Sequence, residues 1–201
     1  MKHLLLLLSL VFHPPLHYEK KVITKPSVQK DFYEKLCDAA VALTKDNVEY
    51  DPAYYAIPYP NGDVPNDKGV CTDVVIRAYR KLRIDLQKEV HLDMKQHFEV
   101  YPKTWGLKTT DTNIDHRRVP NLEVFFKRKG EEKAITQNAA DYQPGDIVTW
   151  RLNGKLPHIG IVINKKSISG RYKIVHNIGY GQVIDDCLFD YPIQGHYRYK
   201  K

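Results

Sequence analysis

The sequence predicts an α+β protein in which N-terminal helices pack on a C-terminal antiparallel sheet of about five strands. Apolar residues recur at helical spacing up to residue 130, whereas the last third of the chain carries short β-branched runs separated by turn residues. A chain of 201 residues with 42% hydrophobic content can bury one good core and is too short for two full-sized domains. We therefore expect a single domain over residues 19–201 behind an N-terminal extension.

The N-terminal extension has the layout of a secretory signal peptide. Lys2 precedes an apolar run from Leu4 to Phe12, which is shorter than the ~20 residues needed to span a bilayer. We expect residues 1–18 to be a signal peptide, cleaved between about Ser9 and Tyr18, and the protein to be periplasmic or secreted. A buried N-terminal helix in a cytosolic protein is the alternative.

The net charge of +7 favours anionic surroundings. The basic residues are scattered among acids and aromatics and form no long basic tail, so we expect no nucleic-acid partner. The expectation is a monomer in peripheral contact with an anionic cell envelope.

The number of cysteines is odd, which leaves at least one thiol unpaired within the chain. The three are Cys37, Cys71 and Cys187, and none forms a C-x-x-C pair. Two arrangements stay open: a bridge between Cys37 and Cys187 with Cys71 free, or three buried thiols.

Four helices are expected before the sheet. The first follows Pro26 with Ser27 as its N-cap, and the last starts near Pro120 and ends at Gly130. The segments that we assign to helices are 27–45, 71–83, 86–101 and 120–130. Between them lie an aromatic-rich loop over residues 50–69 and a second long loop from Trp105 to Leu122.

The strands are expected in an antiparallel meander. Five short runs, most of them rich in β-branched residues, are separated by turn sequences such as "RLNGKLP" and "KSISGR". The five runs are "DIVTW", "HIGIVINK", "YKIVHNI", "QVIDDCLF" and "GHYRYK".

Cys71 lies where the loop "GDVPNDKGV" gives way to a helical run. A sulfur in the first turn of a helix is exposed to unpaired N–H groups and the positive end of the helix dipole, which lowers the thiol pKa. The same N–H groups can stabilise an oxyanion. On this feature alone, a buried structural cysteine remains the simpler interpretation.

Two histidines could serve such a nucleophile. His158 stands at the start of one strand, followed by Gly160, and His176 lies in the next strand along the chain. If the two strands pair as a hairpin, the histidines lie on neighbouring strands, and His176 orients His158 as the base. A zinc site of His158, His176 and Cys187 is the alternative, but H-E-x-x-H and paired cysteines are missing, so we expect no metal and no cofactor.

The ordered motifs "GVCTDVVIRAYRKLRIDL", "QPGDIVTWRLNGKLPHIGIVI" and "KIVHNIG" resemble those of the NlpC-type cell-wall cysteine peptidases of the papain-like superfamily. A more specific resemblance is to domain-of-unknown-function family 1287, through "YPNGDVP", "GVCTDVVIRAYR", "NIDHRRVPNL" and "PGDIVTW". The resemblance implies a papain-like fold in which Cys71 is the nucleophile, His158 the base and His176 the orienting group. Asn177 is the alternative for this third role.

The sequence departs from the peptidase pattern around the cysteine. Val70 stands where these peptidases usually have Asp, and Thr72 and Asp73 stand where they have Ser and Gly. Asp73 could therefore contact a substrate amine or simply cap the helix. Arg117 or Arg118 could bind a substrate carboxylate or pin the loop to Asp111 or Asp115. Tyr59, from the cluster Tyr50, Tyr54, Tyr55 and Tyr59, is a further substrate-binding candidate.

These observations favour an exported cysteine hydrolase that cleaves an amide bond through a thioester on Cys71. Peptidoglycan stem peptides are the expected substrate, and another amide is the alternative. Two further functions remain open: a non-catalytic cell-wall-binding module, and an acyltransferase that uses the same cysteine and histidine.

Overall fold

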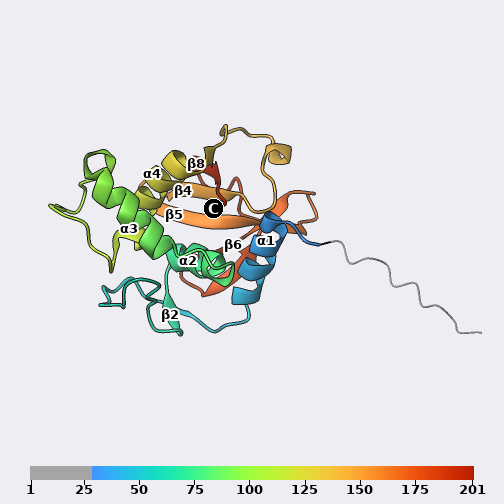
Figure 1. Cartoon of the computed structure of the whole chain (residues 1–201). Helices are drawn as coiled ribbons and strands as arrows, with labels where there is room; N and C mark the ends of the chain where they lie inside the picture. The colour runs from blue at the N-terminus through green and yellow to red at the C-terminus, as the bar shows by residue number, and fades with distance from the viewer. Residues whose placement is uncertain (1–28) are drawn as a thin grey trace, which may run out of the picture.

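The computed structural model describes residues 29–201 (Figure 1). The signal peptide and the N-cap at Ser27 that the sequence predicts lie outside the described residues. Within residues 29–201, no helix is both long enough and apolar enough to cross a membrane.

Residues 29–201 contain four α-helices near the expected positions. Asp31 caps the first helix, accepting a hydrogen bond from the Glu34 N–H, and Gly130 follows the last helical residue of the fourth. The α-helices are α1 (Phe32–Leu43), α2 (Cys71–Lys81), α3 (Leu86–Gln96) and α4 (Val119–Lys129). Short 3-10 turns cover Phe98–Val100, Asp115–Arg117 and Ala139–Asp141. The predicted third helix therefore ends at Gln96, and the 3-10 turn after it accounts for most of the remaining residues.

In the described part of the chain, the main sheet has six strands in the order β3-β8-β4-β5-β6-β7, all antiparallel. Its strands are β3 (Glu131–Glu132), β4 (Ile147–Leu152), β5 (Leu156–Lys166), β6 (Tyr172–Asn177), β7 (Gln182–Asp185) and β8 (Ile193–Arg198). The five predicted strands are β4 to β8, and β3 is the additional one. A separate parallel pair joins β1 (Glu49–Tyr50) to β2 (Lys68–Gly69).

The predicted meander is wrong for its last strand. β8 returns across the sheet to pair with β4 instead of continuing from β7. Tyr197 and Tyr199 at this end of the chain pack on the ring of Phe126 in α4, with ring centroids 6.1 and 5.7 Å away. Burying these aromatic rings against α4 accounts for the position of the last strand.

The sheet separates two apolar clusters. Ile161 and Val175 belong to the larger cluster, which includes residues of α1, α2 and α4. Val162 and Ile174, the next residues along the same strands, belong to the smaller cluster with Trp150. This alternation follows from the period of two in a strand, and Figure 1 shows α1 and α2 beside β5 and β6.

All three cysteines are free and buried, as one of the two open arrangements predicts. Cys37 belongs to the larger apolar cluster and Cys187 to the smaller one, so the sheet lies between them. The bridge between Cys37 and Cys187 is therefore absent.

Candidate active site

Cys71 is the first residue of α2 and is 5% exposed. The backbone N–H of Val70 donates to Oδ2 of Asp73 over 2.7 Å. This bond satisfies one of the free donors at the helix start, so Asp73 stabilises the turn that carries the cysteine.

The loop that leads into Cys71 is held from two sides. Tyr50 pairs with Gly69 in the parallel β1–β2 ladder. Asn177, at the end of β6, donates from Nδ2 to the carbonyl oxygen of Gly69 over 3.4 Å. Because Gly69 lies two residues before Cys71, these contacts fix the cysteine relative to both the sheet and the aromatic-rich loop.

The thiol of Cys71 is protonated at neutral pH. Burial raises the pKa of Cys71 to about 12, and the backbone N–H groups of Ile159 and Thr72 lower it only in part. The expectation that the helix start lowers this pKa is therefore wrong, because the cost of burying a thiolate exceeds the stabilisation from the helix N-terminus. A base has to remove the proton during any attack by the sulfur.

The two predicted histidines lie together on neighbouring strands. Nε2 of His158 in β5 is 2.8 Å from Nδ1 of His176 in β6. Ile161 pairs with Val175 in this register, which places Gly160 beside His176. A Cβ at Gly160 would come within 3.3 Å of Cβ of His176 and 2.5 Å of Cγ2 of Ile174, so glycine makes this close approach of the two strands possible.

Both rings are uncharged at neutral pH. Burial lowers the pKa of His158 to about 3, and the neighbouring His176 acts in the same direction. Burial also lowers the pKa of His176, against the effect of Asp185. Within residues 29–201 no hydrogen bond joins the Cys71 sulfur to either ring, and the thiol instead faces the N–H of Ile159, the residue after His158.

The second nitrogen of His176 faces two further side chains. Its Nε2 is 3.8 Å from Oδ2 of Asp185 and 3.9 Å from Sγ of Cys187. The potential metal-ligand atoms of His176, Asp185 and Cys187 lie within 4.8 Å of one another. This group differs from the zinc site considered from the sequence, because it contains Asp185 in place of His158. Asp185 and His176 thus form a chain of polar contacts that ends at His158.

Cys71 lines a cavity of about 430 Å³. The other residues in its wall include Tyr50, Tyr54, Thr72, Trp105, Ile114, Arg117, Arg118, Val119, Pro120 and Pro157. Of residues 29–201, the charged side chains in this wall are the two arginines, and none of the carboxylates lines it. An uncharged or anionic ligand therefore fits the cavity better than a cation.

Arg117 and Asp73 form a buried, two-pronged ion pair. Nε and Nη2 of Arg117 donate to Oδ1 and Oδ2 of Asp73, each over 3.0 Å, and both side chains are 3% exposed or less. Arg117 thus pins the loop, as one alternative predicts, but to Asp73 and not to Asp111 or Asp115. With both oxygens occupied, Asp73 has a structural partner in place of the predicted substrate amine.

The remaining two predicted binding residues lie in different places. Arg118 lines the cavity with its guanidinium 4.2 Å from the centre of the Trp105 ring. Tyr59 is not among the residues of the cavity wall, and its ring packs against His91 with centroids 5.2 Å apart. The structure therefore brings Arg118, and not Tyr59, to the cysteine.

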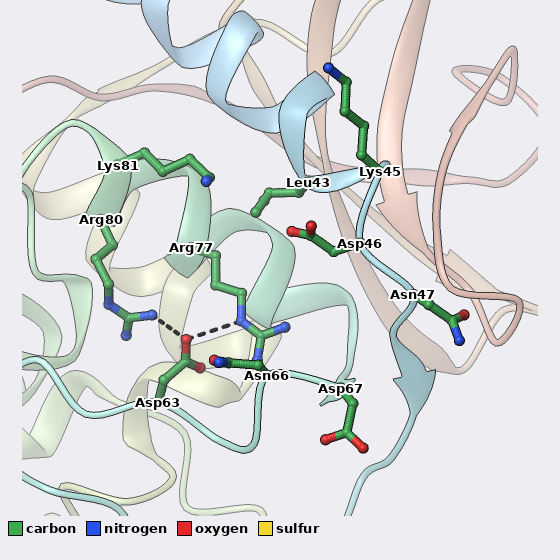
Figure 2. Close-up of a pocket in the computed structure, with 10 residues that line it drawn as sticks. All are labelled: Leu43, Lys45, Asp46, Asn47, Asp63, Asn66, Asp67, Arg77, Arg80 and Lys81. Carbon is green, nitrogen blue, oxygen red and sulfur yellow. Dashed lines mark hydrogen bonds and ion pairs between the residues drawn. The ribbon is translucent and has the colours of Figure 1, made fainter.

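A second cavity, of about 750 Å³, lies apart from the histidines and Cys71, and Figure 2 shows its lining residues. Arg77 and Arg80 both donate to Oδ2 of Asp63, and Arg77 also donates to the Lys68 carbonyl over 2.9 Å. These bonds tie the loop before Cys71 to α2. Arg77 and Arg80 therefore have a structural role in holding this loop.

These features define an α+β protein with a cysteine at a helix start and two hydrogen-bonded histidines on adjacent strands. The chain belongs to the family described as domain of unknown function (DUF1287), whose model matches residues 37–199. The predicted membership of this family is confirmed.

Individual proteins are also similar to this chain. It is 46% identical over 202 residues to "Uncharacterized protein YijF" of Escherichia coli (strain K12), covering 99% of this chain and 98% of that protein. Among solved structures, NlpC1 from Trichomonas vaginalis matches with a TM-score of 0.45 and 20% identity, covering 86% of this chain and 47% of that one. The chain thus spans about half the length of that protein.

Sequence reasoning missed three residues of the site. Asp185 stands in the run "QVIDDC", and only the pairing of β7 with β6 shows that it reaches His176. The sequence identifies Trp105 only as the start of a long loop, whereas the structure places it in the cavity wall. The sequence does not distinguish Tyr50 from the other tyrosines of its cluster. Tyr50 is positioned by its pairing with Gly69, and this two-residue ladder is too short to give a sequence signal.

Proposed function

We propose that this protein is an exported papain-like cysteine hydrolase that cleaves an amide bond through a thioester on Cys71. One observation carries the proposal: Cys71, at the start of a helix and in the wall of a cavity, lies beside a hydrogen-bonded pair of histidines. The N–H that faces its sulfur belongs to Ile159, the residue directly after His158. A nucleophile, a base and a group that orients the base are the minimum set for acyl transfer.

In the proposed reaction, His158 takes the thiol proton as the sulfur attacks the amide carbon. The neutral thiol and neutral imidazole of the resting site make a preformed ion pair unfavourable, so proton transfer accompanies the attack. The C–N bond then breaks and the amine leaves with the proton from His158. Water, activated by His158, hydrolyses the thioester and releases a carboxylic acid.

The tetrahedral intermediate carries its negative charge on an oxygen that needs hydrogen-bond donors. Backbone N–H groups at the start of α2 are one source. Tyr50 is the second, because it lines the cavity with Cys71. Burial raises the pKa of Tyr50, and a negative charge on Cys71 raises it further, which indicates that the two side chains lie near one another. We assign the Tyr50 hydroxyl as a donor to the oxyanion.

Peptidoglycan stem peptides are the proposed substrate, and the periplasm or the outside of the cell the proposed location. The net charge of +7 supports work near an anionic wall polymer, and an arginine in the cavity suits substrates with free carboxylates. The leucine-rich start of the chain supports export.

A second candidate function is cell-wall binding without turnover. The pKa of about 12 for Cys71 favours it, because a thiol that stays protonated is a poor nucleophile. Such a module would sediment with sacculi in the Cys71→Ala variant as well as in the wild type, and neither would release product.

The deciding experiment incubates wild type and Cys71→Ala with purified sacculi and soluble muropeptides, and compares the products by mass spectrometry. We expect new amine and carboxyl ends with the wild type and none with Cys71→Ala. An acyl group trapped on Cys71 and then passed to an added amine would indicate transfer instead of hydrolysis. Identical product profiles for the two proteins would remove the enzymatic proposal.

A further inference from the structure

Among residues 29–201, one positively charged side chain in the wall of the cavity beside Cys71 has no partner. Asp73 takes the Nε and Nη2 donors of Arg117. The side chain of Arg118 makes no hydrogen bond or ion pair with the part of the chain that the structure describes, and its Nη1 is buried. No carboxylate from the described part of the chain lines the cavity to neutralise it.

Arg118 is held in place by contacts that leave its N–H groups available. It is the N-cap residue of α4, and its carbonyl oxygen accepts the N–H groups of Asn121 and Leu122. Its guanidinium lies 4.2 Å from the centre of the Trp105 ring. A contact with an aromatic ring uses none of the N–H donors in a hydrogen bond to an oxygen, so these donors remain available to a ligand.

The surroundings of Arg118 favour a negatively charged ligand. Burial lowers the pKa of Arg118, against the opposing effect of Asp115 and Asp111, and a guanidinium stays protonated in proteins. Arg118 is half-buried, and a charge partly removed from water without a partner is unfavourable, so a ligand of opposite charge offsets that cost. The first residues of α2 and of α4 also line the cavity, and helix N-termini add positive potential.

We propose that Arg118 binds a free carboxylate of the substrate, next to the amide bond that Cys71 attacks. This inference rests on the proposed function and narrows the substrate class to peptide amides with a free carboxylate, not a carboxamide, beside the scissile bond. A carboxylate is planar and can accept two parallel hydrogen bonds from one guanidinium. A carboxamide offers a single acceptor oxygen and no charge.

The test measures binding to Cys71→Ala, so that it is independent of turnover. The probes are the stem tripeptide L-alanyl-γ-D-glutamyl-diaminopimelate and the same peptide with its carboxylates converted to carboxamides. Calorimetry compares both peptides on Cys71→Ala alone and combined with Arg118→Gln, Arg118→Lys or Lys108→Gln. Lys108→Gln is the matched control, since it removes one positive charge from the same loop at an exposed position outside the cavity wall.

We expect Cys71→Ala to bind the carboxylate peptide ~10- to 100-fold more tightly than the carboxamide, as for hydrogen bonds to a charged group. Arg118→Gln should abolish the preference, Arg118→Lys should retain part of it and Lys108→Gln all of it. Equal binding of the two peptides, no binding of either, or a preference that survives in Arg118→Gln overturns the inference. A preference in Cys71→Ala together with a wild type that never releases product overturns the hydrolase and leaves the carboxylate site standing.

Discussion

Nε2 of His158 and Nδ1 of His176 lie 2.8 Å apart across two antiparallel strands. This contact couples the tautomers of the two rings, because only one of the two facing nitrogens carries a proton. The proposed reaction requires Nε2 of His158 to be the donor, which leaves Nδ1 of His158 unprotonated as the base. In that arrangement His176 accepts the hydrogen bond and orients the ring of His158.

Removing this contact should impair the chemistry more than substrate binding. We expect His176→Leu to lower kcat by roughly 10²-fold or more, the usual contribution of an oriented acid–base group, with little change in KM. Steady-state kinetics on a soluble muropeptide measures both. Cys187→Ala is the control, since its sulfur lies 3.9 Å from the other nitrogen of His176 and has no part in the proposed reaction. A His176→Leu enzyme with the wild-type kcat would contradict this role.

Tyr50 should act on the transition state through its hydroxyl group. Tyr50→Phe keeps the ring in the cavity wall and removes the donor, so we expect kcat to fall by roughly 10²-fold, as for other single oxyanion donors. Tyr54→Phe is the matched control: it lines the same cavity, but its hydroxyl accepts a hydrogen bond from Asn113 over 2.7 Å and contacts Asp111. If the two variants lose activity equally, the hydroxyl of Tyr50 has no special role.

Local signals in the sequence predicted the parts of the fold that depend on neighbouring residues. Pro120 and Gly130 bracket α4, and the alternation around Gly160 predicted that His158 and His176 meet. Partners distant in sequence were not predictable. The return of β8 to β4 depends on aromatic packing against α4. The ion pair between Arg117 and Asp73 spans 44 positions, and several carboxylates nearer to Arg117 in the sequence were equally plausible.

The direction in which the pKa of Cys71 is shifted could also not be predicted from the sequence. A helix start lowers a thiol pKa, but burial raises it, and only the structure shows that the sulfur is 5% exposed. With a pKa of about 12, we expect iodoacetamide to label Cys71 slowly at pH 7, and the rate to rise about tenfold per pH unit until the thiolate predominates. Mass spectrometry of peptides from native protein measures the rate, and urea-unfolded protein provides the fast reference. Rapid labelling of native Cys71 at pH 7 would show that the thiol is activated before substrate binds.

Buried neutral histidines should make the protein sensitive to acid. The pKa of His158 and that of His116 are each lowered from 6.5 to about 3, mainly by burial. Because the unfolded chain then binds more protons between pH 6.5 and 3, these residues leave stability intact above pH 6.5 and reduce it progressively as the pH falls through this window.

At pH 5 each of these histidines should lower the free energy of unfolding by about 2 kcal/mol relative to neutral pH. Urea unfolding at pH 7 and pH 5 measures the difference. His116→Gln removes one titrating group away from the proposed catalytic residues, so the fall between pH 7 and pH 5 should shrink by about 2 kcal/mol. A variant whose stability falls as steeply as that of the wild type would show that His116 is already protonated, and therefore hydrated, in the folded protein.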